Sequence, residues 1–191
     1  MIIKENLIYK YDNVITDLEC DKIFNYYKSN HSNDINDTRV LPWFEGNTLY
    51  WNSLKDTSIS NEIEISRNKI IDLVRQSYSV DVYPNVTTLV MWKEGKSMSI
   101  HKDNGYENDK HILHMRTYSS VMYLNDDFEG GETTILKENS DETEYICKPK
   151  KGSVLIFRSD ESCLHGVNKI EKGERLTLSM WFAIDEQYLE K

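Results

Sequence analysis

The second half of the chain is a series of short β-rich segments, and this pattern constrains the fold more than any other feature. Turn signals such as Asn104-Gly105, Gly130-Gly131 and Lys172-Gly173 separate the segments. Strands are predicted over residues 86–92, 115–125, 133–136, 144–148, 153–157, 167–170 and 176–183. Short strands at this spacing are typical of an antiparallel sandwich or jelly roll. The sequence therefore predicts a β-barrel-like core.

The N-terminal part is predicted to be mainly helical. Residues 8–15 have strand-like composition, and Thr16 and Glu19 then form a T-x-x-E capping box that would begin a helix. The apolar residues that follow share one helical face: Cys20, Ile23, Phe24 and Tyr27. A second amphipathic helix is predicted over residues 60–78.

Residues 30–57 show neither strand nor helix periodicity and are predicted to form a long loop or ribbon. They contain four aromatic residues: Trp43, Phe44, Tyr50 and Trp51. No repeat or Pro/Gly-rich linker divides the chain. We therefore expect one α+β domain over residues 1–191, with a helical layer at 1–79 and a jelly-roll core at 80–191.

Composition and charge disfavour several classes of protein. The chain has 23 Lys and Arg against 32 Asp and Glu, and a net charge of −9 would repel nucleic acid. No apolar run is long enough to span a membrane, and the first residues lack the apolar segment of a secretory signal, so a cytoplasmic protein is expected. Cys20, Cys147 and Cys163 have no C-x-x-C spacing, which predicts reduced, buried thiols.

A candidate metal site begins with His101 and Asp103, directly after a predicted strand. In an extended chain, residues i and i+2 point to the same face, so the imidazole and the carboxylate can converge on one ion. His165, 64 residues later, would complete a set of two histidines and one carboxylate. Such a set leaves three positions open on Fe(II). Arg175 follows, a permanent cation suited to a carboxylate.

These residues lie within a series of blocks that resembles a known family. The blocks are IYKYDNVITDLECDKI at 8–23, Trp92 and Gly95 ahead of H-x-D, RTYSSVMYLN at 116–125, EGGET at 129–133, PKKGSVLIF at 149–157 and CLHGVNKIEKGERLTLSMWF at 163–182. In order and spacing they resemble the Fe(II)/2-oxoglutarate-dependent oxygenases, and within them the prolyl 4-hydroxylase-like group. The resemblance implies a double-stranded β-helix (jelly-roll, cupin-like) core with the N-terminal helices packed on it.

The resemblance also implies a cofactor and a reaction. Fe(II), 2-oxoglutarate and O₂ are expected, with ascorbate as an auxiliary reductant. By matching position, His101, Asp103 and His165 are expected to be the iron ligands and the catalytic centre. 2-Oxoglutarate would be decarboxylated to succinate and CO₂ while a substrate C–H bond is hydroxylated.

Three further residues match the co-substrate pocket of this family. Arg175 and Tyr123 are expected to bind the distal carboxylate of 2-oxoglutarate, and Trp181 to lie against the co-substrate. The alternative interpretations are a strand arginine in an ordinary salt bridge, a core tyrosine and a purely packing tryptophan. Many relatives carry a tyrosine ahead of H-x-D, and this chain departs from them with Trp92 and Met98.

The remaining histidines are predicted to have no role in the site. His111 and His114 form H-x-x-H, but residues i and i+3 of a strand point to opposite faces, so surface or loop positions are expected. His31 lies in an Asn/Asp-rich stretch and is expected to be a solvated loop histidine.

The favoured function is hydroxylation of a prolyl residue in a protein or peptide, held under loops 30–57 and 104–114. The aromatic residues of the first loop could instead fill the interface between the helices and the barrel. Alternative functions are a hydroxylase of a free amino acid or small metabolite and a non-catalytic jelly-roll module that binds a metal or ligand. Repair oxygenases of nucleobases typically carry a second arginine where this chain has Trp181, so that function is disfavoured.

Overall fold

The structure is a computed structural model that describes residues 1–31, 45–105 and 113–190. Within these residues it contains the helices α1 (Asp17–His31) and α2 (Thr57–Tyr78) and the short 3-10 helices η1 (Trp51–Ser53), η2 (Glu161–Cys163) and η3 (Glu186–Tyr188). The strands are β1 (Ile2–Lys4), β2 (Ile8–Tyr11), β3 (Asn47–Tyr50), β4 (Tyr83–Lys93), β5 (Met98–His101), β6 (Tyr118–Tyr123), β7 (Glu129–Gly130), β8 (Thr133–Leu136), β9 (Thr143–Cys147), β10 (Val154–Arg158), β11 (His165–Val167), β12 (Ile170–Lys172) and β13 (Glu174–Ala183).

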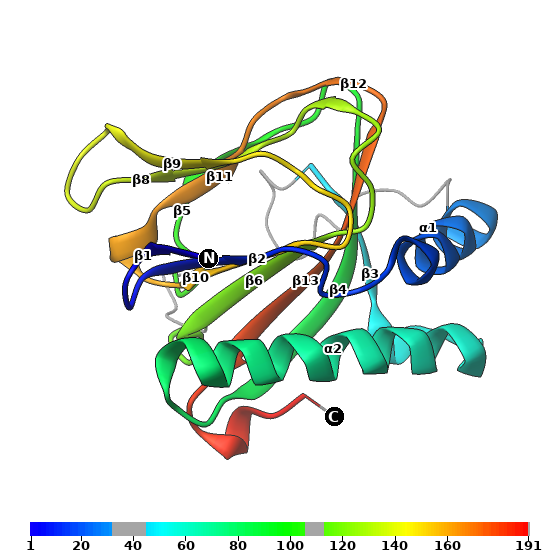
Figure 1. Cartoon of the computed structure of the whole chain (residues 1–191), viewed down its shortest axis with the longest axis horizontal. Coiled ribbons are helices and arrows are strands. Elements are labelled where there is room, and N and C mark those ends of the chain that lie inside the picture. The colour runs from blue at the N-terminus through cyan, green and yellow to red at the C-terminus, as the bar shows by residue number, and fades with distance from the viewer. Residues whose placement is uncertain (32–44, 106–112, 191) are drawn as a thin grey trace.

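The strands form two main antiparallel sheets. The larger sheet has the order β1-β2-β10-β6-β13-β4-β3, the smaller sheet has the order β5-β11-β8-β9, and β12 pairs with β7. In Figure 1 the larger sheet lies between α2 and the smaller sheet, and the chain passes back and forth between the two sheets. This connectivity is that of a double-stranded β-helix. The predicted α+β class with a jelly-roll core is confirmed.

Both predicted helices are present, and each begins at a capping residue. The Thr16 amide donates to Glu19 Oε2 at 2.6 Å and the Glu19 amide donates to Thr16 Oγ1 at 3.2 Å, so the predicted capping box does start α1. The second helix begins at Thr57, earlier than predicted. Its start is set by Asp56, whose carboxylate accepts a hydrogen bond from the Ser58 amide at 2.9 Å.

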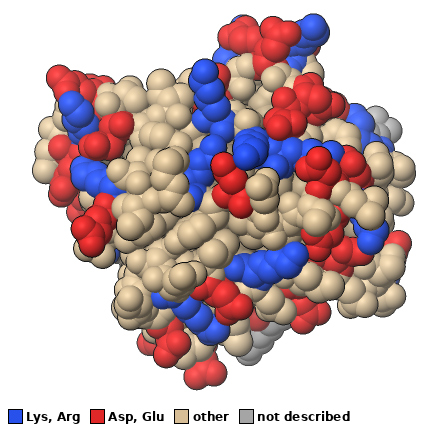
Figure 2. All heavy atoms as spheres, in the orientation of Figure 1, with Lys and Arg blue, Asp and Glu red and all other residues tan. Residues whose placement is uncertain are grey.

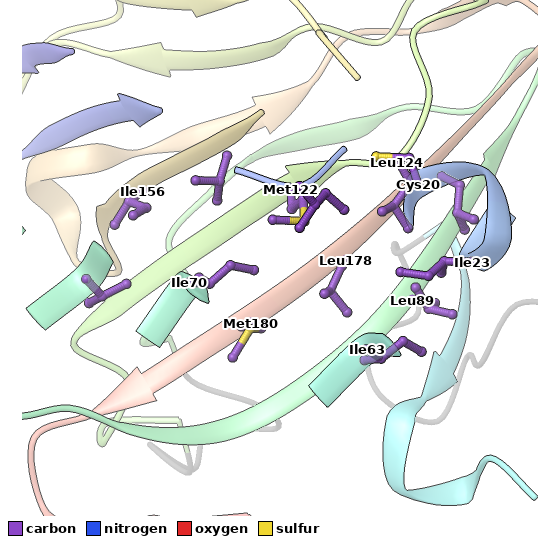
Figure 3. Close-up of a cluster of buried hydrophobic side chains, with 14 of the residues drawn as sticks. Cys20, Ile23, Ile63, Ile70, Leu89, Met122, Leu124, Ile156, Leu178 and Met180 are labelled. Atoms are coloured by element: carbon purple, nitrogen blue, oxygen red, sulfur yellow. The ribbon is translucent and has the colours of Figure 1, made fainter. Parts of the chain in front are cut away.

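The two helices pack on the outer face of the larger sheet and build the main hydrophobic core (Figure 3). Its buried members include Cys20, Ile23, Ile63, Ile70, Leu89, Met122, Leu178 and Met180. Alternate residues of a strand point to opposite faces, so the residues between these core positions face the smaller sheet. The helical core therefore does not occupy the space between the two sheets, where side chains of both sheets can line a pocket. The three cysteines are free and buried, as predicted.

The N-terminal segment contributes strands that the sequence indicated only in part. The strand predicted over residues 8–15 ends at Tyr11, because Asn13 adopts a left-handed turn conformation with a φ of 56°. The edge strands β1 and β3, which have 3 and 4 residues, were not predicted. These strands extend the larger sheet at its two edges.

The strand predicted over residues 167–170 is divided into β11 and β12, which belong to different sheets. Between them the backbone pairs with the loop after β7. The Asn168 amide donates to the Glu132 carbonyl at 2.9 Å, and the Gly131 amide donates to the Lys169 carbonyl at 3.1 Å. A single straight strand is therefore interrupted at Asn168 and Lys169.

A buried ion pair attaches the C-terminal residues to α2 and β4. Arg67 on α2 pairs with Glu190, and their side chains are 9% and 7% exposed. Arg67 Nε also donates to Thr87 Oγ1 at 3.0 Å, and Thr87 Oγ1 donates to Glu190 at 2.6 Å. The guanidinium lies 4.0 Å from the centre of the Trp51 ring. All of the polar partners of this cluster are thus removed from solvent.

We expect the substitution Glu190→Gln to lower the free energy of unfolding by about 3 kcal/mol, because Arg67 would stay buried without its counter-charge. Urea denaturation measures the effect. The matched control is Glu142→Gln, which removes the exposed ion pair of Glu142 with Lys137 and should cost less than about 1 kcal/mol. Equal losses for the two variants would contradict the expectation.

The surface carries mixed charge. On the face shown in Figure 2, acidic and basic side chains are interspersed. The ion pairs of the described residues include Lys69 with Glu19 at 3.1 Å and Lys150 with Asp12 at 3.1 Å. Exposed pairs of this kind contribute little to stability. In the part of the chain that the structure describes, no helix has the length and apolar character needed to cross a membrane.

Candidate active site

Three of the predicted residues meet between the two sheets. His101 ends β5, Asp103 follows it, and His165 begins β11, where it is the register partner of His101. His101 Nε2 lies 3.4 Å from Asp103 Oδ1, and His165 Nε2 lies 3.4 Å from Asp103 Oδ2. One potential ligand atom from each residue lies within 4.8 Å of the other two. The fold therefore brings together residues that are far apart in the sequence.

Backbone carbonyl groups orient both imidazole rings. The Ser99 oxygen lies 2.9 Å from His101 Nδ1, and the Cys163 oxygen lies 3.0 Å from His165 Nδ1. A carbonyl oxygen only accepts, so Nδ1 donates in each ring, and in the neutral form of the ring Nε2 carries the lone pair. Both lone pairs then belong to the nitrogen atoms nearest Asp103. This donor set fits Fe(II), which is commonly held by two histidines and one carboxylate.

Asp103 is held in its ionised form. Burial alone would raise the pKa of this carboxyl group, but the His165 and His101 rings beside it lower the pKa well below its ordinary value. Burial likewise opposes protonation of His101, yet the Asp103 carboxylate raises the pKa of His101 above its ordinary value. A metal ion and a proton would therefore compete for the His101 nitrogen.

A pocket connects this cluster with the inner face of β13. It encloses about 490 Å³ of space, part of it open to solvent. Arg175, Ser179 and Trp181 line it from β13, together with the three clustered residues. Six residues of a strand span about 20 Å, so Arg175 and Trp181 lie at opposite ends of this inner face. The pocket is thus long enough for a small dicarboxylate and part of a second molecule.

Arg175 lines the pocket and is 1% exposed. Its Nη2 donates to Thr133 Oγ1 at 3.2 Å, while Nε has no partner within the described ranges. Burial lowers the pKa of this guanidinium below its ordinary value, and no acidic side chain of the described residues forms an ion pair with it. A buried cation of this kind fits an anionic ligand. The alternative interpretation, an ordinary salt bridge of Arg175 with an acidic side chain, does not apply within the described residues.

Tyr123 and Thr133 complete the surroundings of Arg175. Tyr123 is fully buried, its hydroxyl lies 2.8 Å from Thr133 Oγ1, and its ring centre lies 5.2 Å from the Arg175 guanidinium carbon. Burial raises the pKa of the Tyr123 hydroxyl, so the group stays protonated and can donate. Gly131 is also required here, because a Cβ atom at this position would lie 3.1 Å from Arg175 Cδ and 2.4 Å from Ile170 Cδ1.

Trp181 lines the other end of the inner face. Its ring lies under the Arg116 guanidinium, with 4.5 Å between the ring centre and the guanidinium carbon. Trp181 Nε1 is buried and has no hydrogen-bond partner among the described residues. Trp92 and Met98 form an apolar wall of the pocket with Val90 and Val167.

Two residues near the site were not predicted. Thr133 was recognised only as part of a strand, and Arg116 only as part of a motif. A threonine in a β-rich segment has no sequence signal that separates a ligand-binding role from ordinary strand preference. The EGGET block, which ends at Thr133, was the available clue, because Gly131 allows the close approach of Arg175.

The other predicted residues lie away from the pocket or outside the described residues. Trp43, Phe44 and His111 lie outside the described residues, as do residues 32–44 of loop 30–57 and residues 106–112 of loop 104–114. Trp51 packs against the helical core, as the interface interpretation predicted. His114 is near Tyr188, 3.4 Å from its hydroxyl. His31 was predicted in a loop but is the last residue of α1, beside the Tyr26 and Tyr27 rings.

The turn that leads into His165 is held by Asp160. Its carboxylate accepts hydrogen bonds from Arg158 Nε at 2.8 Å and from the Ser162 amide at 3.1 Å. Burial would raise the pKa of Asp160, but the bonds from Arg158 and Ser162 lower it below its ordinary value of 3.8. The ionised form is thus favoured by folding, and its contribution to stability is present above the ordinary value and lost as the pH falls through the lowered one.

We expect Asp160→Asn to lower the free energy of unfolding by about 1 kcal/mol at neutral pH, a value that allows for solvent screening of the partly exposed pair. The difference between wild type and variant should stay constant down to about pH 4 and shrink below it. Urea unfolding at a series of pH values measures this. A difference that grew toward acidic pH would contradict the assignment.

The sequence profile of the 2OG-Fe(II) oxygenase superfamily matches residues 77–183, which contain all six predicted site residues. The chain belongs to this superfamily. The description of this superfamily names oxygenases of Fe(II) and 2-oxoglutarate, and the donor set of the cluster fits that metal.

Among its relatives, prolyl 3-hydroxylase 2 of Homo sapiens is 39% identical over 75 residues, which are 39% of this chain and 11% of that protein. A viral collagen prolyl hydroxylase from Paramecium bursaria Chlorella virus-1, solved with 2-oxoglutarate, has a TM-score of 0.68 and 17% identity over 97% of this chain and 99% of that chain. A Trichoplax adhaerens prolyl hydroxylase, solved with a hypoxia inducible factor oxygen degradation domain peptide fragment, has a TM-score of 0.74 and 16% identity over 96% of this chain and 86% of that chain. The two structures show the shared fold, and the chain spans about a tenth of the length of the human relative.

Proposed function

We propose that this dioxygenase hydroxylates a prolyl residue of a protein or peptide. The observation that carries the proposal is one pocket that contains both the cluster of His101, Asp103 and His165 and the buried Arg175. The prolyl hydroxylases among the similar proteins support the substrate class.

In this proposal His101, Asp103 and His165 would hold Fe(II), and the pocket beside them would receive the co-substrate. The bound metal supplies O₂ activation, coupled to conversion of 2-oxoglutarate into succinate and CO₂, for hydroxylation of a C–H bond. The Ser99 and Cys163 carbonyl groups keep both imidazole rings in the orientation that coordination requires.

Arg175 and Tyr123 bind the distal carboxylate of 2-oxoglutarate. The unpaired Arg175 Nε and the protonated Tyr123 hydroxyl both donate, and Thr133 Oγ1 keeps the two side chains together. The apolar wall formed by Val90, Trp92, Met98 and Val167 limits the access of water to the reacting groups. Trp181 offers a partly exposed flat ring at the far end, against which a pyrrolidine ring can lie.

The test compares candidate peptides with free L-proline in the presence of Fe(II), ascorbate and 2-oxoglutarate. We expect a proline-containing peptide to gain one oxygen atom by mass spectrometry and to stimulate succinate formation. The control is the same peptide with alanine in place of proline, which should do neither. Strong stimulation by free L-proline, together with inert peptides, would favour a metabolite hydroxylase instead.

A further inference from the structure

Two buried serine hydroxyl groups lie behind the Asp103 carboxylate. Ser119 Oγ lies 2.6 Å from Asp103 Oδ2 and 2.7 Å from Ser159 Oγ. Ser119 and Ser159 are 2% and 0% exposed. The hydrogen bonds of both serine hydroxyl groups are therefore formed within this buried group of three side chains.

The direction of these hydrogen bonds follows from the chemistry of the three groups. An ionised carboxylate only accepts, so the Ser119 hydroxyl must donate to Asp103. The single hydroxyl proton of Ser119 is then used, and the bond between the two serines must be donated by Ser159. The three residues therefore form a directed relay from Ser159 to Ser119 to Asp103.

The relay joins the Asp103 carboxylate to the opposite sheet. The two histidines of the cluster belong to β5 and β11 of the smaller sheet, whereas Ser119 lies on β6 and Ser159 directly follows β10, both in the larger sheet. The backbone of Ser159 reinforces this link. Its carbonyl accepts from the Asp103 amide at 2.9 Å and from the Asn104 amide at 3.0 Å, and its own amide donates to the Thr117 carbonyl at 3.0 Å.

We infer that Ser119 and Ser159 are positioning residues for the metal site, and that their relay fixes which oxygen of Asp103 coordinates the cation. The inference rests on the proposed role of Asp103 as an iron ligand. Each Asp103 oxygen faces one imidazole, Oδ1 that of His101 and Oδ2 that of His165, and the Ser119 hydroxyl donates only to Oδ2. A hydroxyl that donates to Oδ2 reduces the electron density this oxygen can offer, so coordination through Oδ1 is favoured.

Coordination through one oxygen has a consequence for the reaction. A carboxylate that bound through both oxygens would fill one of the three positions that a facial set of ligands leaves open. Those positions are needed for 2-oxoglutarate and O₂. The relay thus preserves the capacity of the site for both co-substrates.

The test uses Ser119→Ala and measures metal binding without turnover. We expect the affinity for Mn²⁺ to fall about 10- to 100-fold, as is typical when a group that orients a metal ligand is removed. The visible absorption spectrum of bound Co²⁺, which reports coordination geometry, should change as well. Ser119→Thr keeps the hydroxyl at a residue that lines the pocket, so it should restore both the affinity and the spectrum.

The matched control is Ser120→Ala, on the next residue of the same strand. Ser120 is 1% exposed, and its hydroxyl has no hydrogen-bond partner among the described residues. This variant should bind Mn²⁺ like the wild type. Equal Mn²⁺ affinities and identical Co²⁺ spectra for Ser119→Ala and Ser120→Ala would overturn the inference.

Two further variants keep the test decisive. His101→Ala removes a proposed ligand directly, so wild-type Mn²⁺ binding by this variant would overturn the proposed metal site itself and not only the relay. If Ser119→Ala does not fold, Ser159→Ala interrupts the relay one step further from the carboxylate. It should show the same spectral change with a smaller loss of affinity, and wild-type values would overturn the inference.

Discussion

Replacing Arg175 with methionine is expected to weaken the binding of 2-oxoglutarate about 30- to 1000-fold, equivalent to about 2–4 kcal/mol. Arg175 is buried and has no acidic partner among the described residues, so its full charge is available to the co-substrate. In the described part of the chain, no hydrogen bond links Arg175 to His101, Asp103 or His165. The affinity for Mn²⁺ should therefore stay near the wild-type value. Calorimetric titration of the metal-free protein with Mn²⁺ measures the metal affinity, and titration of the Mn²⁺-loaded protein with 2-oxoglutarate measures the affinity for the co-substrate.

The matched comparison is Tyr123→Phe, which removes one neutral donor and should cost about 1 kcal/mol. A further expectation concerns stability. Because the uncompensated Arg175 charge opposes folding, the methionine variant should unfold at a higher urea concentration than the wild type when 2-oxoglutarate is absent. Unchanged 2-oxoglutarate affinity in Arg175→Met would show that the distal carboxylate binds elsewhere.

His101→Ala is expected to reduce hydroxylation and 2-oxoglutarate decarboxylation to background, with little effect on folding. The substitution removes one of the three donors that converge between the sheets, and a divalent cation then loses a neutral nitrogen ligand. Succinate formation measures the activity, and circular dichroism checks the fold.

The control for this experiment is His114→Ala. His114 lies beside Tyr188 and is not among the residues that line the pocket. Its substitution should leave succinate formation at the wild-type rate. If His101→Ala retained substantial activity, His101 would not be an essential part of the catalytic centre.

The sequence predicted those parts of the fold that depend on local chemistry. The capping box at Thr16 and Glu19 predicted the start of α1, since both hydrogen bonds form between residues three positions apart. The segment 133–136 was predicted as a strand and is β8 with the same bounds. Turn signals and strand composition act between neighbouring residues, so they do not depend on contacts with distant parts of the chain.

The unpredicted features depend on contacts between distant segments. The short strands β1 and β3 are stable only because the larger sheet offers them an edge. The same reason applies to the site. Ser119 and Ser159 are 40 residues apart, and only the pairing of β6 with β10 brings their hydroxyl groups together. A lone serine in a strand carries no sequence signal for that role.

The histidine and arginine residues of the site were easier to predict because few other roles suit them. A histidine two residues before an aspartate, a second histidine ahead of a later strand and a buried strand arginine together match one family pattern. The structure then adds what the pattern lacks: the carbonyl groups that orient the rings, the hydroxyl relay behind Asp103 and the absence of an acidic partner for Arg175 within the described ranges.

The most direct test of the account is a crystal structure of the protein grown without oxygen in the presence of Mn²⁺ and 2-oxoglutarate. The account predicts one anomalous-scattering peak within coordination distance of His101 Nε2, His165 Nε2 and a single oxygen of Asp103. It also predicts the distal carboxylate of 2-oxoglutarate against Arg175 and Tyr123. A metal peak at any other position, or 2-oxoglutarate bound away from Arg175, would contradict it.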